Sequence, residues 1–254
     1  MRGYRERGVV TAFPCLNRGV SDYDAVASIY DDWLGAMTED VAFYADLARA
    51  ADGPVVELAV GGGRVAVPVA QAIGRPVIGV DVSAGMLDAA RARATEAGVE
   101  LDLRLQDMRD LDLNDPAALV YCPFRSLGHL ATWHDRRRVF ERVADSLLDG
   151  GRFAWNAFVF DPAIAASIDG TWREDGGVRH RVDYVHADNR LSVTFESGAS
   201  LTLWWLTRSE WEALIDVSGL ELEALYGWFD RRPFDETSRE FVFVARKRGQ
   251  TRGV

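Results

Sequence analysis

The sequence predicts an α/β fold built around a doubly wound, mainly parallel sheet, and two observations carry this prediction. Residues 55–60 are an apolar run that ends in three glycines, as expected for a buried strand that turns into a helix. Residues 76–80 form a second apolar run, which ends at Asp81, 20 positions after Gly61. A carboxylate at about this spacing meets a ribose hydroxyl in such sheets, so we expect a cofactor that contains adenosine.

The remaining elements up to about residue 158 alternate between strands and helices, as a doubly wound sheet requires. Helices are expected at residues 22–34, 38–51 and 133–148. Asp22 and Thr38 are the expected caps of the first two helices. Pro68 falls in the first crossover helix, where it is either tolerated near the N-terminus or produces a kink. The apolar face of the helix at 133–148 is formed by Val139, Phe140, Val143, Leu147 and Leu148.

The alternation stops after the fifth strand. Three short strand-like runs follow, at residues 180–185, 190–196 and 200–206, with turn residues between them. Consecutive strands with short turns pair in antiparallel fashion, so we expect residues 170–206 to be an inserted flap over the active site. A helix at 209–218 and two strands at 220–226 and 240–246 complete the chain. Residues 1–20 are expected to be a mobile extension, and residues 21–254 a single domain.

Composition and charge narrow the class of protein. The chain has 254 residues, of which 48% are hydrophobic, and a net charge of −10, which opposes a nucleic-acid-binding role. Cys15 and Cys122 are the two cysteines, so a disulfide framework is excluded and no metal-spaced cluster is present. No apolar run is long enough to span a membrane, and the arginine-containing N-terminus is not a secretion signal. We therefore expect a cytoplasmic protein.

The residues around the glycines indicate which adenosine cofactor is bound. Gly61 and Gly63 are not followed by a glycine at position 65 or 66, so the dinucleotide pattern is incomplete. Glu57 precedes the glycines, and its carboxylate would repel a pyrophosphate. The same carboxylate suits a ligand that carries an ammonium and a sulfonium.

Residues 57–64 read Glu-Leu-Ala-Val-Gly-Gly-Gly-Arg, which resembles the first motif of class I S-adenosylmethionine-dependent methyltransferases. That motif usually reads acid-x-Gly-x-Gly-x-Gly, and Ala59 replaces its first glycine. Four further blocks resemble the family in the same order, at residues 77–87, 105–109, 119–130 and 148–153. The resemblance implies a seven-stranded sheet and S-adenosylmethionine as cofactor, with S-adenosylhomocysteine as product.

The resemblance also implies site residues. Glu57, Gly61 and Gly63 would hold the amino acid part of the cofactor, Asp81 the ribose, and Asp107 with Met108 the adenine. The complete set of expected cofactor contacts is Tyr30, Glu57, Ala59, Gly61, Gly63, Arg64, Asp81, Val82, Met86, Asp107, Met108 and Pro123. The N-terminal segment at 30–33 resembles the part that closes over the cofactor in small-molecule members, although Tyr30 and Trp33 are equally consistent with a helix core.

The acceptor is expected to lie over the loop after the fourth strand. His129 is the candidate general base, because it follows that strand and titrates near neutral pH, and a hydrogen-bonded structural histidine is the alternative. Arg125 would hold an anionic acceptor or pair with an acid at the sheet edge. The expected acceptor contacts are Trp33, Phe124, Arg125, His129 and Trp205. Several of the eight tryptophans fall in or near the flap, so we expect an aromatic or apolar small molecule, methylated on O or N.

Other classes remain as alternatives. Enzymes that methylate RNA or nucleobases usually carry a polar residue, two prolines and an aromatic after the fourth strand, whereas residues 121–124 here read Tyr-Cys-Pro-Phe. Glu57 opposes a nucleotide-dependent oxidoreductase. A non-catalytic relative that keeps the cofactor site is a further alternative, opposed by Asp81 and Asp107. No acidic cluster indicates a metal, and the sequence leaves a homodimer open.

Overall fold

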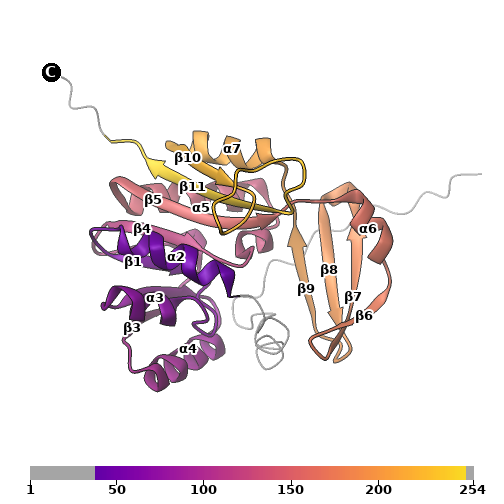
Figure 1. The fold of residues 1–254 in the computed structure, drawn as a ribbon, viewed down its shortest axis with the longest axis horizontal. Helices are drawn as coiled ribbons and strands as arrows, with labels where there is room; N and C mark the ends of the chain where they lie inside the picture. The colour runs from indigo at the N-terminus through magenta and orange to yellow at the C-terminus, as the bar shows by residue number, and fades with distance from the viewer. Residues whose placement is uncertain (1–37, 250–254) are drawn as a thin grey trace, which may run out of the picture.

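The computed structural model describes residues 38–249, which form two sheets (Figure 1). The main sheet has seven strands in the order β10-β11-β5-β4-β1-β2-β3. Its strands are β1 (Val55–Leu58), β2 (Val77–Asp81), β3 (Leu101–Leu105), β4 (Ala117–Cys122), β5 (Leu147–Phe158), β10 (Leu220–Tyr226) and β11 (Glu240–Lys247). β1 to β5 are parallel, whereas β11 is antiparallel to both β5 and β10. The expected doubly wound α/β sheet is confirmed, including the antiparallel pair at its end.

Helices cover both faces of this sheet. They are α2 (Glu39–Arg49), α3 (Ala66–Ile73), α4 (Ala84–Ala97), α5 (Trp133–Ser146) and α7 (Arg208–Val217). One apolar core contains Phe140 of α5, Trp155 of β5 and Trp211 of α7, and another contains Phe43 of α2 and Val69 of α3. All four residues of β1 are buried, so the strand that leads to the glycines is fixed from both sides.

The helix boundaries follow the expected signals with one correction. Thr38 occupies the position before α2, although its side chain caps nothing. Pro68 is the third residue of α3 and is tolerated there, because the first N–H groups of a helix have no partner within it. The prediction of a helix to residue 148 was wrong: α5 ends at Ser146, and Leu148 lies in β5 with 38% of its surface exposed.

The second sheet is the flap, defined here as β6 (Trp172–Asp175), β7 (Val178–Val185), β8 (Arg190–Phe195) and β9 (Ser200–Trp204). It is antiparallel throughout, as expected, but β6 was not among the expected strands. Its apolar face packs with Ile168 of α6 (Pro162–Ile168) and with Phe160. Figure 1 shows the flap beside the main sheet, with β9 nearest to it. The flap is therefore placed next to the loop after β4, as its predicted role requires.

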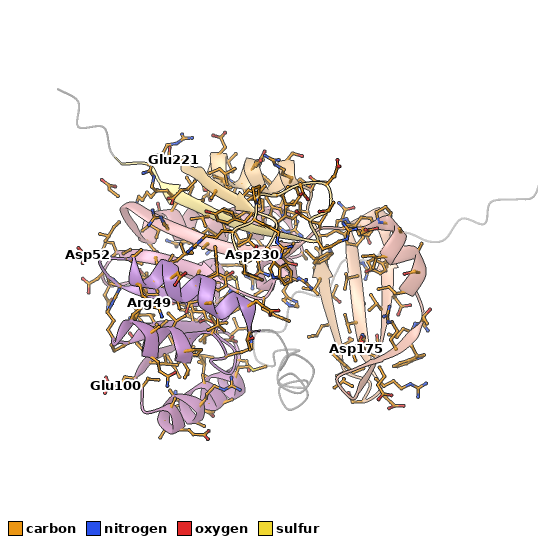
Figure 2. All side chains as sticks on the ribbon, in the orientation of Figure 1. Arg49, Asp52, Glu100, Asp175, Glu221 and Asp230 are labelled. Atoms are coloured by element: carbon orange, nitrogen blue, oxygen red, sulfur yellow. The ribbon has the colours of Figure 1, made fainter. Side chains whose placement is uncertain are left out.

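Many charged side chains lie on the outside of the domain, although Asp40, Glu57 and Glu240 are buried. Asp52, Glu100 and Asp230 are exposed examples (Figure 2). Within residues 38–249, none of the helices has the length and apolar character needed to cross a membrane. The expected helix at 22–34, with Tyr30 and Trp33, and the extension at 1–20 lie outside the described residues.

Candidate active site

The predicted cofactor residues within 38–249 lie where the parallel strands β1, β2, β3 and β4 end. The turn after β1 contains three residues with left-handed backbone, Ala59 (φ 54°), Gly61 (φ 52°) and Gly63 (φ 76°). Glycine adopts this conformation at no steric cost, so the left-handed backbone accounts for glycine at positions 61 and 63. Ala59 is not: a Cβ in this conformation costs roughly 1–2 kcal/mol. The backbone at Ala59, which replaces the first glycine of the motif, is therefore strained.

Asp81 at the end of β2 is held by the glycine turn. Its Oδ2 accepts a hydrogen bond from the Gly61 N–H at 2.9 Å, and its Oδ1 accepts one from the Ser83 N–H at 2.9 Å. Ser83 in turn caps α4 through the Met86 N–H. The carboxylate is thus fixed in orientation while remaining partly exposed at the strand end.

Glu57 is a buried acid in β1. It is 1% exposed, and its Oε2 hydrogen-bonds no other described residue. Burial raises the pKa of Glu57 to about 8, against the opposing effects of the nearby Tyr121 hydroxyl and the Arg64 guanidinium. A buried carboxylate oxygen with no partner is costly unless a ligand satisfies it. The buried carboxylate of Glu57 therefore suits a cationic group of a ligand.

Arg64 follows the glycine turn and is bound by an acid of α2. Its Nη1 and Nη2 donate to the two carboxylate oxygens of Asp40 at 2.8 and 2.5 Å. Asp40 is fully buried, and the guanidinium also lies 5.3 Å from the Phe124 ring centre. This bidentate pair joins α2 to the glycine turn and holds Arg64 in place.

Asp107 lies in the loop after β3, beside η1 (Met108–Asp110). Its carboxylate accepts the Arg109 N–H at 2.9 Å and the Arg109 Nη2 at 2.5 Å. Burial acts to raise the pKa of Asp107, but the hydrogen bonds and charge of Arg109 outweigh it and hold the pKa below its usual value. Met108 is partly buried against the core, whereas Val82 after Asp81 is 54% exposed. Asp107 is thus an oriented, ionised acceptor.

The loop after β4 carries the predicted acceptor residues. Phe124 and Arg125 both have left-handed backbone, with φ of 58° and 62°. The Pro123 carbonyl accepts the Ser126 hydroxyl at 2.8 Å. Arg125 forms a bidentate ion pair with Glu240 of β11, with Nη2 2.6 Å from Oε2. Arg125 thus pairs with an acid, which lies at the start of the inner strand β11 and not on an edge strand; its contact with an acceptor stays a prediction.

His129 lies at the junction of this loop and the flap. Its Nδ1 is 2.9 Å from the Thr202 carbonyl of β9 and therefore carries the proton there. Burial lowers the pKa of His129 to about 4, and the bond to Thr202 only partly offsets this effect. The histidine is neutral at physiological pH and a weak base. Its catalytic role remains a prediction.

Three tryptophans in or near the flap and the end of the main sheet contact other side chains. Trp205 is 7% exposed and stacks on Phe160, with ring centres 4.3 Å apart. Trp172 is 42% exposed but lies under Arg179, and Trp228 packs on Phe229. Contacts within the protein therefore explain the positions of these rings, and the rings do not support the prediction of an aromatic acceptor.

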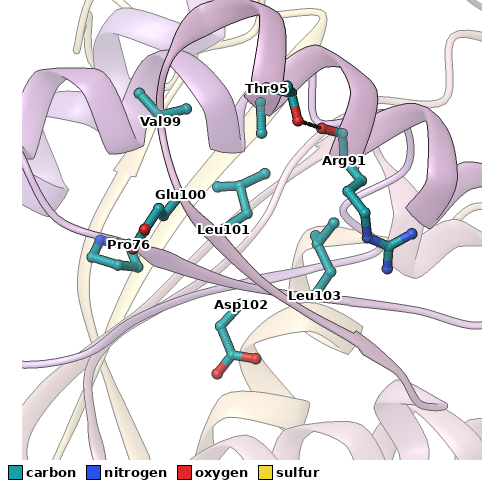
Figure 3. Close-up of a pocket in the computed structure, with 9 residues that line it drawn as sticks. Pro76, Arg91, Thr95, Val99, Glu100, Leu101, Asp102 and Leu103 are labelled. Carbon is teal, nitrogen blue, oxygen red and sulfur yellow. Dashed lines mark hydrogen bonds between the residues drawn. The ribbon is translucent and has the colours of Figure 1, made fainter.

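A hollow between α4 and β3 lies away from these residues (Figure 3). It is lined by Pro76, which precedes β2, and by Leu101 at the start of β3, so it lies at the amino ends of the strands. Ligands of doubly wound sheets bind at the carboxyl ends, and we assign this hollow no role. Within residues 38–249, no group of three or more His, Cys, Asp or Glu side chains is arranged to hold a metal ion.

Sequence reasoning missed the residues that hold the site residues in place. Asp40, Asn156 and Glu240 are buried polar side chains from α2, β5 and β11. Asn156 interrupts the apolar run at 153–158 and Glu240 directly precedes the apolar run at 241–245, and this is a signal that was visible in the sequence. Their partners come from distant segments and were not predictable from spacing.

Known proteins with a similar sequence or fold are methyltransferases. Residues 55–151 match the family described as "Methyltransferase domain". The methyltransferase CcbJ of Streptomyces caelestis has a similar structure, with a TM-score of 0.76 and 28% identity over 88% of this chain and 96% of that one. The chain is therefore similar to methyltransferases both in the sequence of residues 55–151 and in its fold.

Two further proteins are similar to this chain. A Streptomyces fradiae protein named dTDP-3-amino-3,6-dideoxy-alpha-D-glucopyranose N,N-dimethyltransferase is 30% identical over 168 residues. The alignment covers 59% of this chain and 64% of that relative, which is less than two thirds of its length. An S-adenosylmethionine-dependent methyltransferase from Clostridium acetobutylicum shares the fold, with a TM-score of 0.75 and 16% identity over 90% of this chain and all of that one.

Proposed function

We propose that this protein transfers a methyl group from S-adenosylmethionine to the amino group of a small molecule, and specifically of an amino sugar. The observation that carries the proposal is a group of three acids at the carboxyl ends of neighbouring strands. Glu57 is buried and has an oxygen without a hydrogen-bond partner, Asp81 is held by Gly61, and Asp107 is held by Arg109. In this proposal they bind the ammonium, the ribose hydroxyls and the adenine amino group.

The bound cofactor supplies a methyl group on a positively charged sulfur, which is already a good leaving group. The protein then has to bind the acceptor and align its nucleophile with that methyl group. Glu57 would bind the ammonium of the cofactor, because a buried carboxylate that releases its proton on binding attracts a cation strongly. The loop at 123–130 and the flap would hold the acceptor.

An amine acceptor is favoured over a hydroxyl. A free amine attacks through its lone pair and has no need to lose a proton beforehand, whereas a hydroxyl needs a base. His129 is partly buried, neutral and weakly basic. The S. fradiae relative is named as an N,N-dimethyltransferase of a nucleotide-linked amino sugar, which supports the same acceptor class.

The test is a methylation assay with matched acceptors, read by mass spectrometry. The purified protein is incubated with S-adenosylmethionine and either a dTDP-linked 3-amino sugar or the same sugar with a 3-hydroxyl group. We expect methylation of the amino sugar and none of the hydroxyl analogue. Methylation of the hydroxyl analogue alone would overturn the proposed acceptor class.

A further inference from the structure

Four polar side chains form a continuous hydrogen-bonded chain beneath the acceptor loop. The Tyr44 hydroxyl of α2 donates to Asn156 Oδ1 at 3.1 Å, and Asn156 Nδ2 donates to Glu240 Oε1 at 2.6 Å. Glu240 then accepts Nε and Nη2 of Arg125 at 3.1 and 2.6 Å. The chain crosses from one face of the main sheet through β5 and β11 to the loop after β4.

The chain is almost completely buried. Tyr44 and Glu240 are 0% exposed and Asn156 is 1% exposed, whereas the Arg125 side chain is 35% exposed. Burying a carboxylate requires full compensation by hydrogen bonds, and an apolar residue is often as stable or more stable at such a position. A purely stabilising role therefore explains this arrangement poorly.

The exposed end of the chain is attached to strained backbone. Phe124 and Arg125 are consecutive residues with left-handed backbone, and neither is a glycine. Such residues cost about 1–3 kcal/mol each and persist where the surrounding structure holds them. The bidentate pair between Arg125 and Glu240 is a charged side-chain contact that holds this point of the loop.

The buried end of the chain reaches the cofactor acid. Tyr44 stacks on Tyr121 of β4, with ring centres 4.9 Å apart, and Tyr121 is paired with Glu57 of β1 in the sheet register. The same strand β4 leads two residues later into the acceptor loop. One buried network thus adjoins both the predicted ammonium site and the loop that faces the acceptor.

We propose that Glu240 is a positioning residue for methyl transfer, which holds the acceptor loop at 123–130 in place through Arg125. This inference rests on the proposed function. Arg125 is neutralised by Glu240 and serves as the loop anchor, so it does not provide a site for an anionic acceptor. Asn156 and Tyr44 fix the Glu240 carboxylate from the other side.

The test compares Glu240→Gln with a matched control, Glu223→Gln. Glu223 pairs with Arg152 at the other end of β5, and its side chain is 32% exposed, whereas Glu240 is fully buried. Hydrogen exchange should become at least about tenfold faster in residues 123–130 of E240Q, with no change in β1, and E223Q should match the parent protein. In the amino-sugar assay, kcat/KM for the acceptor should fall at least about tenfold in E240Q. The Kd for S-adenosylhomocysteine should stay within about twofold of the parent value.

A double variant separates positioning from stability. E240Q leaves the Arg125 charge without its partner, and the added substitution Arg125→Met removes that charge. The double variant should regain thermal stability but not acceptor kcat/KM. If it regains both, or if E240Q leaves exchange at 123–130 unchanged, the positioning role is wrong. If E240Q does not fold, Arg125→Lys provides the same comparison, because Lys keeps the charge and loses the bidentate geometry.

The two proposals fail in different ways. Should the parent protein bind no S-adenosylhomocysteine and methylate no acceptor, the proposed function fails. The exchange measurement on E240Q then still decides whether Glu240 holds the loop. Should the parent protein be active and E240Q keep the parent kcat/KM, only the positioning role fails.

Discussion

The Asp81 carboxylate accepts a hydrogen bond from the Gly61 N–H at 2.9 Å. This bond joins the ends of β1 and β2, and it sets the orientation of the acid that we assign to the ribose. Gly61 has φ of 52°, so its N–H points toward Asp81 in a conformation that other residues rarely adopt. The spacing of 20 residues in the sequence thus corresponds to a direct contact.

Replacing Asp81 with Ala should weaken binding of S-adenosylmethionine by about 1–3 kcal/mol, because the hydrogen bonds to the ribose are lost. Isothermal titration calorimetry measures this change. Part of the effect will come from the Gly61 turn, so Asp81→Asn, which keeps one acceptor oxygen, should lose less. Unchanged affinity in D81A would show that Asp81 does not contact the ribose.

Glu57 should make cofactor binding depend on pH. The pKa of Glu57 is raised to about 8 in the ligand-free protein, so binding of a cationic cofactor at lower pH must displace a proton. Affinity should therefore rise with pH up to about 8 and level off above it, by at most about tenfold per pH unit. Calorimetry at pH 7 in two buffers of different ionisation enthalpy should show proton release, which Glu57→Gln should abolish along with most of the affinity.

The same raised pKa predicts the sign of a stability change. The folded-state pKa of Glu57 lies above its ordinary value of 4.5, so the contribution of the protonated carboxyl is complete below that value. It is lost progressively as the pH rises through about 8. Without ligand, E57Q should therefore gain melting temperature relative to the parent protein as the pH rises. A constant difference between the two proteins across this range would contradict the assigned pKa.

Restoring the family glycine at position 59 should stabilise the protein. Ala59 has φ of 54°, and glycine relieves roughly 1–2 kcal/mol of strain while adding some entropy to the unfolded chain. The net gain in free energy of unfolding should be about 1 kcal/mol. Urea denaturation of A59G checks this value, and a loss of stability would show that the Ala59 methyl group makes compensating contacts.

Arg109 should support adenine recognition through Asp107. Removing the side chain in Arg109→Ala leaves Asp107 with the Arg109 backbone N–H but without the guanidinium, and affinity for S-adenosylmethionine should fall by about 1 kcal/mol. The control is Arg104→Ala, because Arg104 pairs with Asp102 two residues away in the same way but on the outside of β3. Equal effects of the two variants on calorimetric affinity would refute a specific role of Arg109.

The role of His129 can be decided by substitution. If the acceptor is an amine, His129→Asn should lower kcat by less than about tenfold, because no base is required. The pH–rate profile should then lack a limb near 6.5, since the pKa of His129 is lowered to about 4. A loss of about a hundredfold or more would instead establish His129 as the general base.

The central sheet was predictable because its signals are local. Buried parallel strands are apolar throughout, and the glycines after β1 are required by the backbone conformation. The spacing of Gly61 and Asp81 predicted a ribose contact for Asp81, whereas the hydrogen bond between the two residues was not predicted. The antiparallel order of β10, β11 and β5 was likewise predicted, from the family resemblance.

Elements and contacts that depend on tertiary structure were harder to predict from the sequence. The four residues of β6 are all exposed, so no apolar pattern marks that strand. Leu148 fits the helical pattern of α5, yet the chain turns into β5 one residue earlier. The pairs Arg64–Asp40 and Arg125–Glu240 join residues 24 and 115 positions apart, which no local pattern can reveal. The sequence therefore predicts the cofactor acids better than the residues that position them.

The most direct test of the cofactor assignment is calorimetric titration of the folded protein with S-adenosylmethionine and S-adenosylhomocysteine, with NAD as the comparison ligand. We expect both sulfur-containing ligands to bind with dissociation constants on the order of micromolar, and NAD not to bind. Binding of NAD, or no binding of either sulfur-containing ligand to the folded protein, would contradict the roles assigned to Glu57, Asp81 and Asp107.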